Sequence, residues 1–85
     1  MTLEELLDTG WERDGEVLAK SFKFRNFSEA FGWMTRVALA AEKADHHPDW
    51  SNSWNRVDVR LTTHSAGALT EKDVKLASVM EKLAG

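Results

Sequence analysis

The residues best suited to chemistry in this sequence are its three histidines. His46 and His47 are adjacent in the stretch ADHHPDW, residues 44–50, and His64 follows His46 by eighteen positions. Histidine is the side chain whose ordinary pKa lets it gain and lose a proton near neutral pH. Three histidines around one segment indicate a site, and the alternative is a solvated loop that carries them by coincidence.

Three kinds of chemistry are open to these side chains. Three histidines can bind zinc, but an adjacent pair is poor spacing for ligands on a helix or a strand. Nucleophilic catalysis is weaker still, because no nearby serine (Ser51, Ser53 or Ser65) lies in a G-x-S-x-G turn. General acid–base catalysis fits best, since imidazoles can both give and take protons, at a gain of about 10²–10⁴-fold in rate. Elimination of water needs such a pairing, because hydroxide leaves badly unless it is protonated.

Composition excludes several other classes of function. The 85 residues are 42% hydrophobic and include four tryptophans and four phenylalanines, enough for one small domain over residues 1–85 with a real core. Without cysteine there is neither a disulfide nor a thiolate nucleophile. A net charge of −3 argues against sequence-independent nucleic-acid binding. The acidic start does not resemble a signal peptide, and no stretch approaches the roughly 20 apolar residues of a membrane span. We therefore expect a soluble, cytoplasmic domain that binds neither membrane nor nucleic acid directly.

The first half of the chain predicts a helix, a hairpin and a longer helix. Residues 2–8 are typical of a short helix capped by Thr2, and Asp14-Gly15 separates two strand-like runs as a hairpin turn would. From Asn26 the apolar spacing becomes helical, which predicts a helix that ends near Ala44 or Asp45. Its expected buried stripe is Phe27, Phe31, Met34, Ala38 and Ala41.

The second half predicts a strand and a final helix. The run NRVDVRLTTH alternates, with Val57, Val59 and Leu61 on one face and His64 at the end with the parity of the polar face. The stretch SAGA predicts a bend and a short edge strand. Thr70 is expected to cap the last helix, with Asp73 at the capping-box position. The apolar stripe of that helix is Leu76, Met80 and Leu83.

This order of elements favours an α+β two-layer sandwich, an antiparallel sheet with helices packed on one face. His46 and His47 then lie in the loop that enters the central strand, and His64 lies where that strand ends. Because consecutive side chains of an extended segment point to opposite sides, the two adjacent histidines should have different roles in the site. Trp50 beside them offers a flat apolar face for stacking a ring, or serves as a core anchor.

Residues 42–77 closely resemble the pterin-4a-carbinolamine dehydratase family. The hallmark is His-His-Pro-x-Trp after an acidic residue, then an Asn-x-Val strand, a Thr-His pair and a Leu-Ser/Thr-Glu-x-Asp helix start. The residues in register are Glu42, His46, His47, Pro48, Trp50, Asn55, Val57, Thr63, His64, Leu69, Thr70, Glu71 and Asp73. A Thr-His fifteen residues after Pro48 makes the match specific.

The resemblance implies a four-stranded antiparallel sheet and a reaction. The family dehydrates 4a-hydroxytetrahydropterins, the products of aromatic amino acid hydroxylases, to quinonoid dihydropterins in tetrahydrobiopterin-type recycling, with no metal or other cofactor. His47 would hold the pterin, while His46 and His64 would protonate the 4a-hydroxyl, one for each epimer. The pterin would lie against His46–Pro48 and Thr63–Ala66. The implied site residues are His46, His47, Pro48, Thr63, His64, Ser65 and Ala66, with Glu42 orienting an imidazole and Trp50 walling the pocket.

Two residues depart from the family pattern. Ser65 stands where many relatives carry an acidic residue, so a carboxylate acceptor for the pterin would be missing, although a backbone contact there would survive. Ala68 replaces a common glycine, which costs about 1 kcal/mol only if that position needs a positive φ. Both leave the three histidines intact.

The resemblance also implies partners. We expect a homodimer or homotetramer and, in the pathway, an aromatic amino acid hydroxylase. The alternative function is a non-catalytic binding module, because animal relatives bind a homeodomain transcription factor as a dimerisation cofactor through the helical surface that otherwise builds their tetramer. Val74 and Val79 give the last helix more apolar surface than one stripe needs. Either two sides of this helix are buried in the core, or one side contacts another subunit. Intact histidines favour the enzyme.

Overall fold

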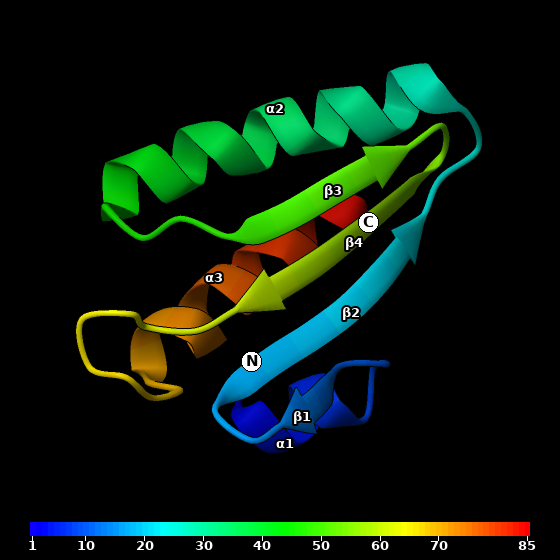
Figure 1. Ribbon diagram of the computed structural model, residues 1–85. Helices are drawn as coiled ribbons and strands as arrows, with labels where there is room; N and C mark the ends of the chain where they lie inside the picture. Colours follow the sequence, from blue (N-terminus) through cyan, green and yellow to red (C-terminus); the bar gives the residue numbers. More distant parts are fainter.

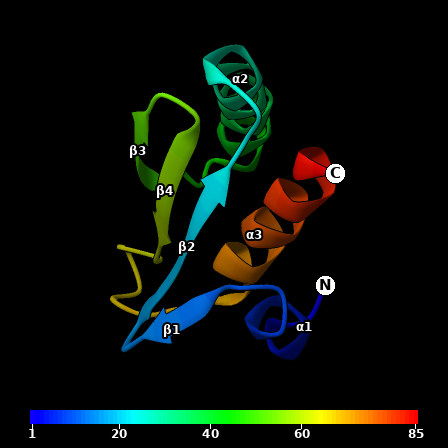
Figure 2. The same ribbon diagram turned by 90° about the vertical axis from the view of Figure 1, so that its right-hand side faces the viewer.

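The computed structural model describes residues 1–85 as three helices and four strands (Figure 1). In chain order they are α1 (Leu3–Leu7), β1 (Glu12–Asp14), β2 (Val17–Lys23), α2 (Phe27–Ala44), β3 (Asp49–Ser53), β4 (Arg56–Leu61) and α3 (Glu71–Ala84). The strands form one antiparallel sheet in the order β1-β2-β4-β3, and the helices lie on one face of it (Figure 2). The predicted α+β sandwich with a four-stranded antiparallel sheet is confirmed.

The core lies between the sheet and the helices, and β4 contributes most to it from the sheet side. Its alternation follows the prediction, with Val57, Val59 and Leu61 buried. Leu18 and Phe22 of β2 are buried beside them, directly opposite Leu61 and Val57. The central pair of strands therefore fixes which face of the sheet the helices cover.

The predicted buried stripe of α2 was wrong. The structure buries Ala30, Trp33, Val37 and Ala41, and of the predicted stripe only Ala41 is among them. Phe27 and Phe31 are 48% and 55% exposed. Trp33 decides the rotation: its ring lies 4.5 Å from that of Phe22, and its Nε1 donates to the carbonyl oxygen of Met80 at 3.1 Å. Phe31 and Trp33 are roughly 200° apart around a helix, so burying one turns the other outward.

The position of the fourth strand was also wrong. The edge strand is β3, which pairs with β4 through a tight hairpin, whereas SAGA forms a turn that contributes only the isolated bridge between Thr63 and Ala68. Four of the five residues of β3 are polar and only Trp50 carries a large apolar side chain toward the core, so its alternation is weak. As a consequence, the loop that carries His46 and His47 enters an edge strand instead of the central one.

The last helix is buried on two sides. Leu76 and Met80 are buried as predicted and Leu83 is partly buried, while Val74 is also in the core. Val79 is half-buried. Core packing therefore accounts for most of the extra apolar surface of α3. None of the helices has the length and apolar character that crossing a membrane requires.

Candidate active site

The loop between α2 and β3 sends the two adjacent histidines in different directions. Asp45 ends α2 in the left-handed conformation with φ of 52°, and the backbone N–H of His46 then returns to the carbonyl of Ala41 at 3.1 Å. This reversal turns His46 inward, where it is 9% exposed. The side chain of His47 stays 57% exposed. The structure thus gives the two imidazoles different surroundings, as expected if they have different roles.

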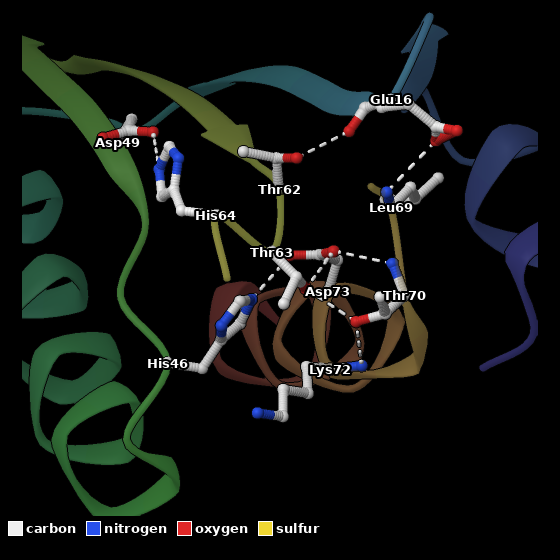
Figure 3. A network of polar contacts seen from close by, with 10 residues as sticks. All are labelled: Glu16, His46, Asp49, Thr62, Thr63, His64, Leu69, Thr70, Lys72 and Asp73. Atoms are coloured by element: carbon white, nitrogen blue, oxygen red, sulfur yellow. Dashed lines mark hydrogen bonds and ion pairs between the residues drawn. The ribbon is translucent and has the colours of Figure 1, made fainter. Parts of the chain in front are cut away.

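His46 contacts the fully buried carboxylate of Asp73, which lies in the first turn of α3. Its Nε2 is 2.6 Å from Oδ1 of Asp73 (Figure 3). The other oxygen, Oδ2, accepts from the hydroxyl of Thr63 and the backbone N–H of Thr70, both at 2.9 Å. We assign Oδ1 as the acceptor and Nε2 of His46 as the donor of this hydrogen bond, so that Nε2 carries the hydrogen. This contact leaves Nδ1 of His46 as the ring nitrogen without a partner in Asp73.

Asp73 thus has two functions at once. Within α3 it completes the capping box with Thr70, as the sequence predicted. It also links α3 to the end of β4 through Thr63, whose Oγ1 lies 2.6 Å from that of Thr70. Since Thr63 donates to Asp73, it must accept from Thr70, and the chain of hydrogen bonds runs in one direction toward the carboxylate. The sequence indicated only the cap, because nothing local shows that a histidine 27 residues earlier reaches the same group.

The two exposed histidines also have carboxylate partners. Nε2 of His47 lies 2.9 Å from Oε1 of Glu42 in the last turn of α2, where the resemblance placed an orienting carboxylate. Nε2 of His64 lies 3.2 Å from Oδ2 of Asp49, the first residue of β3. The side chains of His64 and Asp49 are 74% and 64% exposed, so each such pair is worth about 0–1 kcal/mol. Sequence reasoning missed Asp49, because only the β3–β4 hairpin brings it next to His64.

The turn that carries His64 is held by the β1–β2 hairpin. The hydroxyl of Thr62 donates to the backbone carbonyl of Glu16 at 2.8 Å, and the carboxylate of Glu16 accepts from the backbone N–H of Leu69 at 3.1 Å (Figure 3). One residue therefore fixes both ends of the turn. Asp45 and Trp54 are the two non-glycine residues with a positive φ. Ala68 is not among them, so an alanine in place of the common glycine causes no backbone strain at this position.

The loop and the turn converge on a hollow of about 200 Å³, which we call the histidine hollow. Its lining residues are Asp45, His46, His47, Thr62, Thr63, His64, Ser65 and Lys72. All three histidines are brought together, and Asp45, Thr62 and Lys72 are additions that the sequence did not indicate. No group of three or more histidine and acidic side chains is placed to hold a metal ion.

Four of the expected site residues lie outside the lining of the histidine hollow. Pro48 and Ala66 belong to the two converging segments but are not part of the lining, and Glu42 contacts it through His47. Trp50 does not wall the hollow. It faces the core side of β3, with its ring 6.3 Å from that of Trp33, because alternation along β3 points it opposite to Asp49.

Comparison with known proteins identifies the family of this chain. The family model described as pterin 4 alpha carbinolamine dehydratase matches residues 1–83. The chain belongs to this family. A protein of Rhizobium rhizogenes named "Putative pterin-4-alpha-carbinolamine dehydratase" is 60% identical over 77 residues, which cover 88% of this chain and 76% of the relative.

Two solved structures are similar to this family member. The crystal structure described as a transcriptional coactivator/pterin dehydratase from Brucella melitensis has a TM-score of 0.90 and 48% identity, covering 100% of this chain and 98% of that one. A pterin dehydratase-like protein described as a RuBisCO assembly factor in the alpha-carboxysome has a TM-score of 0.76 at 23% identity, covering 89% of this chain and 90% of that one. At that identity the second structure shows the fold alone.

For a pterin-4a-carbinolamine dehydratase family member, the histidine hollow offers proton donors and acceptors on two sides. His46 approaches from the α2–β3 loop and His64 from the turn after β4 (Figure 3). Lys72 adds a cationic side chain at the same rim.

Proposed function

We propose that this chain dehydrates a 4a-hydroxytetrahydropterin to a quinonoid dihydropterin and water. The observation that carries the proposal is the gathering of three imidazoles, each with its own carboxylate, around one hollow. The family membership supports the same substrate class.

The reaction needs one proton delivered and one removed. The C4a–O bond breaks as an imidazolium protonates the 4a-hydroxyl, which leaves as water. The electron pair of N5 forms the C4a=N5 double bond, and the N5 proton passes to a base. Two imidazoles on opposite sides of the ring can serve either 4a epimer, so we assign His46 and His64 as the acids. His47, exposed and paired with Glu42, is assigned to hold the pterin.

Asp73 prepares His46 for this task. The buried carboxylate fixes the tautomer with hydrogen on Nε2 and holds the ring in one orientation, which leaves Nδ1 for exchange with the substrate. Asp49 and Glu42 orient the two exposed imidazoles more loosely, since solvent screens both pairs. His46 is therefore the most rigidly positioned of the three.

A coupled assay tests the proposal. An aromatic amino acid hydroxylase generates the 4a-hydroxytetrahydropterin, and the decay of its absorbance is followed with and without the protein. We expect the protein to accelerate the decay in proportion to its concentration. A folded protein that gives no acceleration would rule out the dehydratase. Acceleration in this assay would also support the proposed role in tetrahydrobiopterin-type recycling with a hydroxylase. The cytoplasmic location of the protein stays a prediction.

A second role is favoured by the exposed apolar side chains of α2. Phe27, Phe31 and Leu39 are 48%, 55% and 70% exposed, and the rings of the two phenylalanines lie 5.7 Å apart. Clustered apolar side chains of this kind mark protein-interaction surfaces. We name these three side chains the α2 stripe and propose that it is buried between subunits of a homodimer or homotetramer. The alternative is that a different protein covers it, in a binding-module role.

Phe31→Glu is expected to break this assembly. A charge placed in the centre of the α2 stripe would have to be desolvated in the interface, which costs several kcal/mol. Light scattering coupled to size-exclusion chromatography should show a dimer or tetramer for the wild type and a smaller species for the variant.

Leu7→Glu is the matched control, because Leu7 is 40% exposed on α1, away from the stripe. It should leave the assembly unchanged. If Phe31→Glu also keeps the wild-type mass, the α2 stripe is not the interface. A wild type that is monomeric alone would favour the binding-module role.

A further inference from the structure

A second hollow adjoins the histidine hollow, between the C-terminal half of α2 and the N-terminal half of α3. It has a volume of about 270 Å³. Its lining residues are Ala40, Ala44, His46, Lys72, Lys75, Leu76 and Val79. His46 and Lys72 line both hollows, so the two are neighbours that share one imidazole and one ammonium group. We call the second one the helix hollow.

The chemistry of the helix hollow differs from that of its neighbour. Its floor is apolar, made by Ala40 and Ala44 of α2 and by Leu76 and Val79 of α3. Its charged lining groups are Lys72 and Lys75, and no carboxylate lines it. Neither lysine belongs to an ion pair, although the chain carries a net charge of −3. Two unpaired cations above an apolar floor suit a ligand with an apolar stem and an anionic end.

The order of atoms in a pterin connects the two hollows. The reacting atoms of the proposed dehydration are C4a and N5, and C6 is bonded directly to N5. A substituent on C6 therefore leaves the ring next to the imidazoles that act on C4a and N5. His46 is the imidazole that borders both hollows. A side chain on C6 that passes this imidazole enters the helix hollow.

We propose that the helix hollow takes the C6 side chain of the pterin and selects side chains with an apolar stem and a carboxylate or phosphate end. This inference rests on the proposed dehydratase site. The stem would lie on the alanine, leucine and valine side chains, and the anionic end would meet Lys72 and Lys75. A short neutral C6 group would leave the hollow empty and gain nothing from it.

Equilibrium binding of stable dihydropterins tests the inference without turnover. The probes are 7,8-dihydrofolate, with an aryl stem and carboxylates, 7,8-dihydroneopterin monophosphate, with a phosphate, and 6-methyl-7,8-dihydropterin, which is short and neutral. We expect at least one anionic probe to bind roughly tenfold tighter than the methyl compound at low salt, and the difference to shrink as salt screens the lysines. Of the two anionic probes, dihydrofolate should bind tighter, because its aryl stem is apolar whereas the trihydroxypropyl stem of the phosphate probe is polar.

Lys75→Gln is the informative variant, because Lys75 lines only the helix hollow and has no place in the proposed catalytic machinery. It should weaken the anionic probe about fivefold and leave the methyl compound unchanged. Lys82→Gln, the same change farther along α3 and outside both hollows, should alter neither affinity.

The outcomes separate this inference from the function on which it rests. Equal affinity for all three probes, or equal effects of Lys75→Gln and Lys82→Gln, would overturn the role of the helix hollow while leaving the dehydratase standing. Failure of every probe to bind, together with no acceleration in the coupled assay, would overturn both.

Discussion

The double variant His46→Ala/His64→Ala is expected to lose nearly all acceleration of the dehydration. Each positioned proton transfer is worth about 10²–10⁴-fold, and the two imidazoles are the proposed acids on the two sides of the pterin. We expect kcat to fall by roughly 10³-fold or more, measured as the decay of the 4a-hydroxytetrahydropterin in the coupled assay. Each single variant should retain activity on one 4a epimer, because the opposite imidazole survives.

Stability must be measured beside activity for these variants. His46→Ala leaves Oδ1 of the buried Asp73 without its partner, which costs about 1–3 kcal/mol. His64 is exposed, so His64→Ala should unfold at the wild-type temperature. His47→Ala provides the contrast, since loss of a holding contact should raise KM more than it lowers kcat. A folded double variant that keeps activity within threefold of the wild type would show that neither imidazole is the acid.

The elements that sequence predicts well here are those specified by local chemistry. The alternation of Val57, Val59 and Leu61 predicts a strand without any knowledge of the strands beside it. Thr70 caps α3, as its spacing with Asp73 predicted. Both patterns depend on residues within one element. Their physical cause, burial of one strand face and satisfaction of free N–H groups, is present in the sequence itself.

The errors share a different origin, which is competition between elements. The period of α2 fits two stripes, and the choice between them is made by Trp33 packing on Phe22 and bonding to Met80. The edge strand β3 is polar and is held mainly by its pairing with β4, so its own residues signal it weakly. The local sequence around α2 does not indicate its contacts with Phe22 and Met80, and the local sequence around β3 does not indicate its pairing with β4.

The candidate site shows the same division. Histidine type and spacing predicted the three imidazoles, and the resemblance supplied Glu42 beside one of them. Asp49 and Glu16 were missed, because each acts across a tertiary contact that only the sheet creates. Asp73 was predicted correctly as a cap, but its contact with His46 was not predicted, because it too crosses between elements.

Asp73→Asn is the sharpest test of how the site is positioned. The amide oxygen can still accept from Thr70 and Thr63, but the amide nitrogen then faces Nε2 of His46 and donates to it. The imidazole must shift its hydrogen to Nδ1, the atom proposed to exchange protons with the substrate. For the 4a epimer that His46 serves, we expect kcat/KM to fall about 10²-fold or more, by the tautomer effect known from serine proteases, with an unfolding cost of only about 1–2 kcal/mol.

Nitrogen-15 chemical shifts of the His46 ring separate this effect from simple loss of structure. They should report hydrogen on Nε2 in the wild type and on Nδ1 in the variant, at temperatures where both are folded. Glu71→Gln removes the same charge from the neighbouring exposed position of α3 and should change neither tautomer nor rate. Asp73→Ala, by contrast, leaves three donors unpaired in the core and should destabilise the fold by about 3–5 kcal/mol. If Asp73→Asn keeps both the wild-type tautomer and the wild-type rate, Asp73 is a helix cap and nothing more, and the proton chemistry of His46 does not depend on it.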